Sequence, residues 1–344
     1  MTKCRQVAQR ITYNKKASME LHPSIIFLGG LVVILLGAEL VLRGATRVAA
    51  ILRVNPIIIG LSIVSVGTSM PELAVGITAV ADGFDQLAVG NIAGTNIINL
   101  LFILGLSAAI KPLPLQLMSI KLDVPVMIAS SLVLIAMAAD GILTRFEGFL
   151  LVLGSIAYFI TLIKLSRRET AEIKKEFEEE FSINAITKKP RLVQYGYIVI
   201  LLVGIGLSIL GANLLVSGAV NIARSLGISD AIVGLTIVAV GTSAPELATT
   251  IVGTIKNDRD VVLGNLIGSS TTNILVILGF TCIAAPHGIN VSKDVLWFDL
   301  PLAAAVAICC YPIFRSDRMV SRKEGIAFVV TYLIYLTTLI FLRI

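Results

Sequence analysis

The sequence has little charge and few aromatic side chains for its length. Only 15% of its 344 residues are charged and 6% are aromatic, whereas 56% are hydrophobic. Runs without a charged residue recur from Ile25 to the C-terminus, and such runs are typical of helices that cross a membrane. The shortage of charge therefore excludes a water-soluble globular domain and predicts an all-α polytopic membrane protein.

Histidine and cysteine are also scarce. The two histidines, His22 and His287, lie at predicted span edges, where an interfacial position accounts for them. The four cysteines, at positions 4, 282, 309 and 310, show neither paired metal-ligand spacing nor a disulfide framework. The serines lack a nearby histidine or lysine base, which disfavours an intramembrane protease. We therefore expect no cofactor and no enzymatic activity.

The basic excess does not indicate nucleic-acid binding. The formal net charge is +6, but the basic residues gather at the ends of the predicted spans, where flanking positions are solvated. We expect membrane lipid around the chain, no nucleic acid and no obligate protein partner. The predicted location is the plasma (inner) membrane, with several crossings.

Ten segments are long and apolar enough to cross a bilayer, which takes about 20 residues per helix. Residues 1–23 are predicted to form an N-terminal tail, and its first part is too hydrophilic for a secretory signal peptide. Met19 is an alternative start to Met1. The ten predicted spans cover about 24–46, 57–81, 86–109, 122–140, 147–165, 195–222, 231–255, 260–284, 295–314 and 324–342.

One polar motif interrupts two of these spans. Residues 67–72 read Gly-Thr-Ser-Met-Pro-Glu, and residues 241–246, which lie 174 positions later, read Gly-Thr-Ser-Ala-Pro-Glu. A carboxylate in the middle of a membrane helix costs roughly 2.5 kcal/mol or more, so it usually faces a cavity. Pro71 has no backbone N–H, so the helix is expected to kink or break there. Spans 2 and 7 are therefore predicted to be broken helices.

The two halves of the chain are a duplication. The offset of 174 residues persists without a gap from Gly37 onward, as the pairs Gly60 and Gly234, Asn91 and Asn265, and Gly94 and Gly268 illustrate. Each half holds five spans, an odd number, which predicts two inverted five-helix repeats with a site near the midplane. Basic residues are concentrated in the loops predicted to be cytoplasmic, which supports this topology. The basic N-terminal tail disagrees unless Met19 is the start.

The predicted repeats divide the chain into four parts. The first repeat covers residues 24–165, with its motif region at 60–106, and the second covers 194–344, with its motif region at 234–280. A cytoplasmic linker at 166–193 joins them. Its acidic middle (Glu176, Glu178, Glu179 and Glu180) suggests regulatory calcium binding, but the ligand spacing of a calcium loop is missing. A solvated helical connector is the favoured interpretation.

Each motif forms one polar face. On a helix, Thr68 and Ser69 share a face with Glu72, and Thr242 and Ser243 share one with Glu246. The next span in each half adds a stripe, namely Asn91, Thr95 and Asn99 in the first half and Asn265, Ser269 and Asn273 in the second. Gly90 and Gly94, like Gly264 and Gly268, are spaced to allow close helix approach. Such oxygen-rich clusters suit a bare cation.

Charge arithmetic favours exchange over simple binding. Two carboxylates neutralise one Ca²⁺, which takes six to eight oxygen ligands, or two Na⁺. One cavity holds either load but hardly both, because the same carboxylates compensate each. Mutual exclusion at a shared site that opens to both sides of the membrane is antiport.

These residues carry a family resemblance. The two Gly-Thr-Ser-x-Pro-Glu motifs, followed by Gly-Asn-Ile-Ala-Gly-Thr-Asn at 90–96 and Gly-Asn-Leu-Ile-Gly-Ser-Ser at 264–270, resemble the repeats of the calcium/cation antiporter superfamily, especially its prokaryotic sodium/calcium exchangers. The resemblance implies that Glu72 and Glu246 coordinate Ca²⁺ beside the carbonyls of Thr68 and Thr242. It implies Na⁺ sites that draw on Ser69, Thr95, Ser243, Ser269 and the carbonyls of Ser65 and Ala239, with Asn99 and Asn273 at the central position. The family often has aspartate where this chain has Asn273.

The resemblance implies exchange of Ca²⁺ for Na⁺ by alternating access. Spans 2, 3, 7 and 8 would surround the ions, while spans 1 and 6, rich in small residues, would slide across them. A proton-coupled or K⁺-dependent exchanger and a cation channel are the alternatives, although the neutral Thr95 and Ser269 suit Na⁺ better than protons. Glu39, in span 1, either lines the ion path or pairs with Arg43 one turn on.

Overall fold

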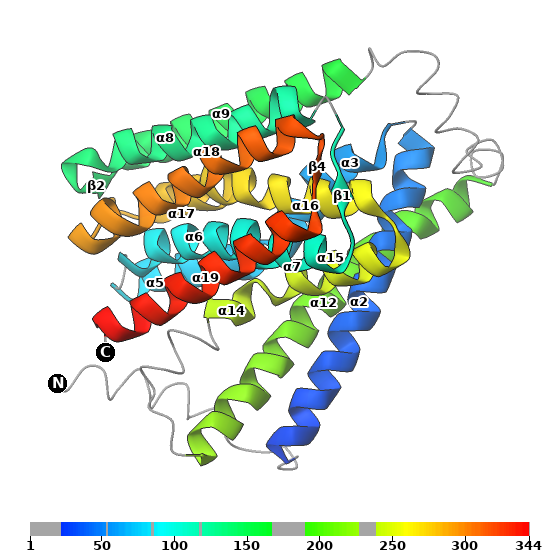
Figure 1. The fold of residues 1–344 in the computed structure, drawn as a ribbon, viewed down its shortest axis with the longest axis horizontal. Coiled ribbons are helices and arrows are strands. Elements are labelled where there is room, and N and C mark those ends of the chain that lie inside the picture. The colour runs from blue at the N-terminus through cyan, green and yellow to red at the C-terminus, as the bar shows by residue number, and fades with distance from the viewer. Residues whose placement is uncertain are drawn as a thin grey trace.

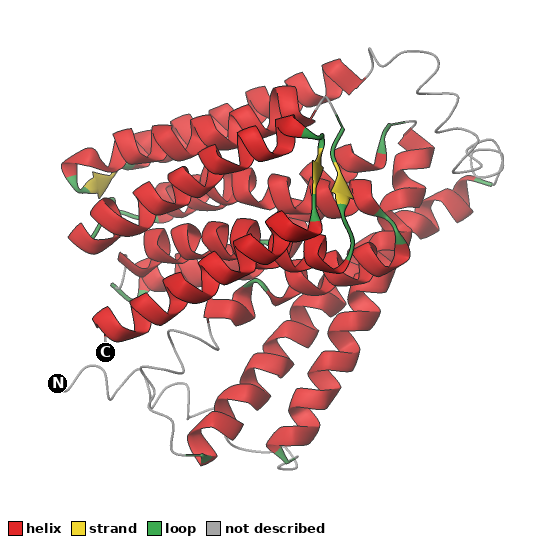
Figure 2. Ribbon diagram, viewed as in Figure 1, coloured by secondary structure: helices red, strands yellow, loops and turns green. Residues whose placement is uncertain are grey.

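The computed structural model describes residues 22–52, 54–83, 86–116, 119–166, 190–226 and 239–343. These residues are predominantly helical, with two short strand pairs (Figure 2). Eight of the described helices are long and apolar enough to span a membrane, and they match eight predicted spans to within a few residues at most ends. They are Pro23–Leu52, Ile57–Ala81, Leu87–Ile110, Ser119–Asp140, Arg145–Leu165, Val193–Ile222, Arg259–Ala284 and Val295–Ser316.

The first half of the chain runs from α2 to α9, and several of its spans are built from consecutive helical segments that differ in hydrogen-bonding pattern. Three of the segments, labelled η1, η2 and η3, are π-helical, and η4 is a 3₁₀ turn. The elements are α2 (Pro23–Leu52), α3 (Pro56–Ile59), η1 (Gly60–Val64), α4 (Ser65–Thr68), α5 (Met70–Ala81), α6 (Gln86–Ile97), η2 (Ile98–Ile103), α7 (Leu104–Ile110), β1 (Leu113–Pro114), η3 (Ser119–Asp123), α8 (Val124–Met137), η4 (Ala138–Asp140), β2 (Ile142–Leu143) and α9 (Arg145–Ser166).

The second half repeats this order from α12 onward. The predicted span 231–255 begins in a stretch outside the described residues, and α15 forms its second part. The elements are α12 (Arg191–Ser225), α14 (Ala239–Thr242), α15 (Ala244–Lys256), α16 (Arg259–Thr272), the π-helical η6 (Asn273–Leu278), α17 (Gly279–Ala284), β3 (Ile289–Asn290), the π-helical η7 (Val295–Asp299), α18 (Leu300–Ser316), β4 (Met319–Val320) and α19 (Arg322–Arg343). The tail 1–21 and most of the linker, with its acidic cluster, also lie outside the described residues.

The two strand pairs tie one half of the chain to the other. β1 pairs with β4 in antiparallel fashion, Leu113 opposite Val320, and β2 pairs with β3, Leu143 opposite Ile289. β1 and β3 occupy equivalent places in the two halves, as do β2 and β4, so the second pair is the first with the halves exchanged. The loops that carry β1 and β4 are both predicted to be cytoplasmic, and those that carry β2 and β3 are both predicted to lie on the opposite side.

Helices α2 and α12 form a pair that is inclined to the other helices (Figure 1). They run antiparallel, with glycines at seven-residue steps where the backbones touch. A Cβ on Gly30 would lie 2.4 Å from the Leu215 nitrogen, and one on Gly37 would lie 2.5 Å from the Ser208 nitrogen. A Cβ on Gly211 would meet the Ile34 nitrogen at 2.4 Å. Only glycine allows this approach, so the small residues of spans 1 and 6 bind these two helices to each other.

Helices α2 and α12 are longer than predicted. The predicted spans 24–46 and 195–222 fall inside Pro23–Leu52 and Arg191–Ser225. Charged residues near the ends of the predicted spans, such as Arg47, indicated a boundary, but the helix continues through them because long charged side chains reach polar surroundings from inside a helix. An inclined helix also needs more residues to cross the same thickness.

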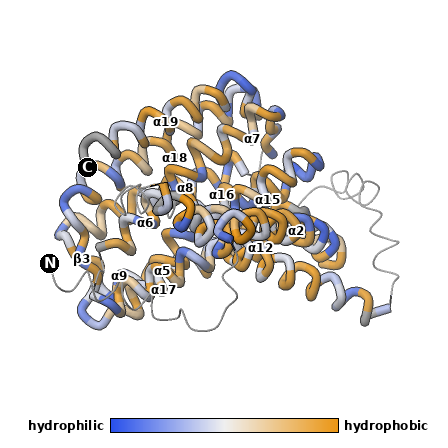
Figure 3. The backbone as a smooth tube through the Cα atoms, turned by 90° about the horizontal axis from the view of Figure 1, so that it is seen from below, coloured by the Kyte–Doolittle hydropathy of each residue, from blue (hydrophilic) through white to orange (hydrophobic). Residues whose placement is uncertain are grey.

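The outward-facing side chains are apolar. In Figure 3 the hydrophobic colour runs along the helices, and much of the hydrophilic colour gathers at the turns between them. Phe146 on α9, Trp297 on η7 and Leu202 on α12 are each more than half exposed. Large exposed apolar side chains over many helices are what a lipid environment accepts and water does not.

Candidate functional site

The polar motif breaks the helix at the same position in both halves. Ser69, between α4 and α5, has φ −84° and ψ 10°, and Ser243, between α14 and α15, has φ −84° and ψ 8°. Pro71 and Pro245 lie in the first turns of α5 and α15, where the missing N–H is tolerated. The predicted breaks in spans 2 and 7 are thus present, and a new helix N-terminus starts at each motif.

The two carboxylates lie in the first turns of these new helices. Glu72 in α5 and Glu246 in α15 are both 0% exposed. The positive end of a helix macrodipole favours a negative charge there and offsets part of the cost of its burial. Each carboxylate is therefore supported by the helix that the preceding break creates.

Each motif contacts the other half of the chain. The Ser69 hydroxyl donates a hydrogen bond of 3.1 Å to Oε1 of Glu246. Helix α15, which carries Glu246, also packs against α4 of the first motif. The Thr68 hydroxyl lies 3.1 Å from Oδ1 of Asn265 and 3.0 Å from the carbonyl of Val64, and its single proton serves one of these acceptors at a time. The motifs, 174 residues apart in the sequence, therefore meet in one buried cluster.

Many polar atoms of this cluster have no hydrogen-bond partner among the described residues. They are both oxygens of Glu72, Oε2 of Glu246, the hydroxyls of Ser243 and Ser269, both amide atoms of Asn99, Oδ1 of Asn273 and Nδ2 of Asn265. Leaving one such buried group unsatisfied costs about 1–3 kcal/mol. Most of these atoms are oxygens, the donor set that Ca²⁺ and other hard cations require. The oxygen atoms of the cluster are therefore suited to bind a cation.

The polar stripes of the following spans lie in buried positions. Thr95 on α6, Asn99 on η2, Ser269 on α16 and Asn273 on η6 are all at most 2% exposed. Asn99 and Asn273 lie at the beginning of π-helical segments, which shift the direction of the following side chains and recur at functional sites. Asn91 is only partly buried, although its amide nitrogen has no partner among the described residues.

Fewer contacts are described for the two residues whose carbonyls are predicted to bind Na⁺, Ser65 and Ala239. The carbonyl of Ser65 accepts the backbone N–H of Ser69 at 3.2 Å and also lies 3.4 Å from the hydroxyl of Thr68. Ala239 is the first residue of α14. Their roles, like the ligand roles of the side chains, stay predictions.

Close helix approach at the site is observed in the second half. A Cβ on Gly264 would lie 2.4 Å from the carbonyl oxygen of Ile57, and one on Gly268 would lie 2.7 Å from Cα of Leu61. Helix α16 thus packs backbone to backbone against α3 and η1 of the first half. Gly90 and Gly94 show no such contact with described residues, and the counterpart of η1, at 234–238, lies outside the described residues.

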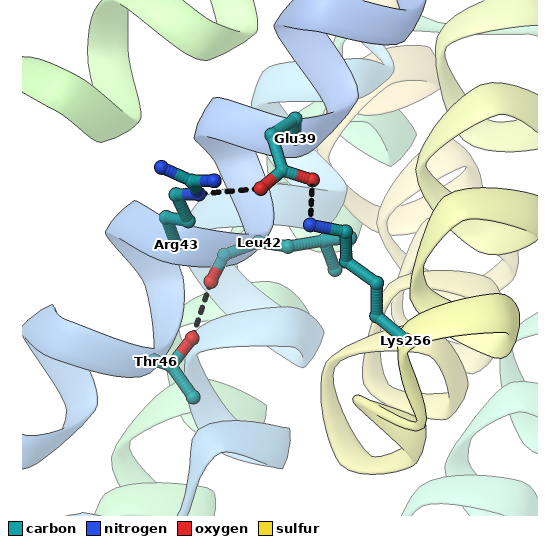
Figure 4. A network of polar contacts seen from close by, with 5 residues as sticks. All are labelled: Glu39, Leu42, Arg43, Thr46 and Lys256. Atoms are coloured by element: carbon teal, nitrogen blue, oxygen red, sulfur yellow. Dashed lines mark hydrogen bonds and ion pairs between the residues drawn. The ribbon is translucent and has the colours of Figure 1, made fainter.

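Glu39 belongs to an ion-pair network between helices α2 and α15. Its carboxylate pairs with Arg43 one turn further along α2 and with Lys256 at the end of α15 (Figure 4). The pairing with Arg43 was one of the two predicted roles. The sequence gives no signal for the pairing with Lys256, because this residue is far from Glu39 in the chain. The network links α2 to the broken helix that carries Glu246.

Comparisons with known proteins identify the family of the chain. The family described as "Sodium/calcium exchanger protein" matches residues 22–164 and 196–341, which is nearly all of both halves. The chain is 35% identical to CaxA of Alkalimonas amylolytica, over 91% of this chain and 97% of that protein. It is 30% identical to the inner membrane protein YrbG of Escherichia coli (strain K12), over 91% of this chain and 95% of that protein.

The fold also matches a solved structure of an exchanger. The sodium-calcium exchanger NCX_Mj, soaked with 10 mM Na⁺ and zero Ca²⁺, superimposes with a TM-score of 0.78 and 27% identity, covering 92% of this chain and 98% of that one. Its family is one of transporters, and the apolar helices described above are those of a multi-pass membrane protein. On the family match, the sequence relatives and the fold together, the chain belongs to the sodium/calcium exchanger protein family.

Proposed function

We propose that the chain exchanges Ca²⁺ for Na⁺ across the plasma (inner) membrane by alternating access at a site built around Glu72 and Glu246. The observation that carries the proposal is the crossed contact between the halves, in which Ser69 binds the carboxylate of Glu246 while the oxygens of Glu72 have no described partner. Two carboxylates in one neighbourhood repel each other unless cations lie between them. One Ca²⁺ or two Na⁺ remove that repulsion, but not both at once.

The ligand roles follow from this arrangement. Glu72 and Glu246, with the carbonyls of Thr68 and Thr242, hold Ca²⁺. The Na⁺ ions use Ser69, Thr95, Ser243 and Ser269, together with the carbonyls of Ser65 and Ala239, and Asn99 and Asn273 complete the centre. Burial of most of these side chains and the unsatisfied atoms among them support the assignment.

We further propose two inverted five-span repeats, 24–165 and 194–344, with the linker 166–193 in the cytoplasm. The eight spans described above are completed to ten by span 7, which ends in α15, and by span 10, which α19 forms. The exchange of β1·β4 for β2·β3 between the halves supports a twofold relation.

Alternating access follows from the glycine-rich pair of α2 and α12. Because glycines bring the two backbones into contact, the pair moves as one body. We propose that it slides over the site helices and opens one side at a time. An exchanger needs two alternative arrangements of the α2 and α12 pair against the site helices, and it does not need a continuous pore.

Isotope flux tests the proposal. Purified protein in liposomes loaded with Na⁺ and diluted into Na⁺-free buffer is expected to take up ⁴⁵Ca²⁺, because outward Na⁺ movement drives the exchange. Matched liposomes with an outward K⁺ gradient, an outward H⁺ gradient or no gradient are expected to stay at the level of protein-free liposomes. Uptake driven by H⁺ alone would instead indicate a proton exchanger, and uptake without any gradient a channel.

A further inference from the structure

A short amide network connects the two polar stripes. Nδ2 of Asn96 donates a hydrogen bond of 3.0 Å to the backbone carbonyl of Ser270. Nδ2 of Asn273 donates one of 3.1 Å to Oδ1 of Asn96. Asn96 is 4% exposed and Asn273 is 0% exposed, so water does not compete for these bonds. Asn96 has serine at its equivalent in the second half, residue 270.

The network determines which way each amide points. A backbone carbonyl only accepts hydrogen bonds, so the end of the Asn96 side chain that faces Ser270 must be its NH₂ group. The other end of Asn96 is then an oxygen, which also only accepts. Asn273 must therefore present its own NH₂ group to Asn96. The remaining atom, Oδ1 of Asn273, has no hydrogen-bond partner among the described residues.

The orientation matters because a cation binds the oxygen of an amide and is repelled by its N–H groups. Helix η6, which begins with Asn273, packs against α5, the helix whose first turn carries Glu72. We propose that Asn96 is a positioning residue that holds the amide of Asn273 with its oxygen toward the transported cations. This inference rests on the proposed function and adds to it a residue that touches no ion.

Asn99, the equivalent of Asn273 in the first half, has no such hydrogen-bond network among the described residues. Both amide atoms of Asn99 are without a partner in the part of the chain that the structure describes. Serine at position 270 has no amide with which to orient Asn99, and its hydroxyl donates to the Leu266 carbonyl at 3.1 Å. Among the described residues, the orienting network is thus present on the side of Asn273 only. An aspartate has two equivalent oxygens and needs no such orientation.

A double-mutant cycle tests the proposal. Asn96→Leu keeps the branched shape of the side chain but removes both hydrogen bonds, so the amide of Asn273 becomes free to turn. The Na⁺ or Ca²⁺ concentration for half-maximal exchange is expected to rise about tenfold, the effect of losing roughly one oriented hydrogen bond. Asn273→Asp provides a ligand with two equivalent oxygens. In that background Asn96→Leu is expected to change the same concentrations by less than about twofold.

A merely structural role of Asn96 would weaken exchange equally in both backgrounds, and that additive result would overturn the inference. If Asn96→Leu does not fold, Asn96→Asp takes its place, because it keeps the acceptor for Asn273 and replaces the donor that faces the Ser270 carbonyl by an oxygen. Its cation affinity is expected to equal or exceed that of the wild type, and a lower affinity would contradict the proposal. Wild-type protein without Na⁺-driven uptake would instead contradict the proposed function itself.

Discussion

Replacing Glu72 or Glu246 by glutamine is expected to abolish Na⁺-driven Ca²⁺ uptake while the protein still inserts and folds. Each carboxylate is fully buried and lies at the start of a helix. Removing one of two charges that compensate a buried cation costs about 3 kcal/mol or more, which is about a hundredfold in affinity. Both variants should therefore fall to the level of protein-free liposomes in the ⁴⁵Ca²⁺ flux assay.

Glu39→Gln is the matched control for these two variants. Glu39 is also an acidic residue in an apolar helix, but its carboxylate pairs with Arg43 and Lys256. Its substitution is expected to leave uptake within about threefold of the wild type, because partly exposed ion pairs contribute about 1 kcal/mol or less. Full activity of Glu72→Gln or Glu246→Gln, with protein of normal size-exclusion profile, would contradict the assigned roles.

The second large effect is expected from a single methyl group on helix α12. Gly211→Ala places a Cβ 2.4 Å from the backbone nitrogen of Ile34, so α2 and α12 must separate. We expect this overpacking to destabilise the protein by about 1–3 kcal/mol or more and to lower its melting temperature in detergent. Transport should fall as well, because the proposed movement requires the two helices to stay together.

Gly206→Ala, on the same helix, is the control with the opposite expected sign. A Cβ on Gly206 meets no atom within 4 Å, and alanine favours a helix over glycine by about 0.8–1 kcal/mol. This variant should melt at the same temperature as the wild type or higher. Equal destabilisation by Gly206→Ala and Gly211→Ala would show that the backbone contact between α2 and α12 is not what requires glycine.

The sequence was sufficient to predict the spans and the broken helices because both depend on local properties. Long apolar runs predicted eight of the observed spans to within a few residues at most ends. Proline next to a glutamate in an apolar run predicted the breaks at Ser69 and Ser243. The repeat of the motif predicted that the two glutamates work together, although a repeat alone does not place them in contact.

The contacts between the halves depend on the packing and were not predictable. Nothing in the sequence pairs Ser69 with Glu246 or Lys256 with Glu39, because the pairs lie far apart in the chain. Asn96 was overlooked for a different reason. The duplication marks positions that carry the same type of residue in both halves, and the equivalent of Asn96 is Ser270. The seven-residue spacing of Gly30, Gly37 and Gly44 was a readable signal of helix contact that identified no partner helix.

Competition between the two ions at equilibrium tests the central claim most directly. ⁴⁵Ca²⁺ bound to the purified wild-type protein is measured by equilibrium dialysis while Na⁺ is increased at constant ionic strength with choline. We predict a single Ca²⁺ per chain that Na⁺ displaces completely, because the carboxylates of Glu72 and Glu246 serve one load at a time. Ca²⁺ that stays bound at saturating Na⁺ would contradict a shared site.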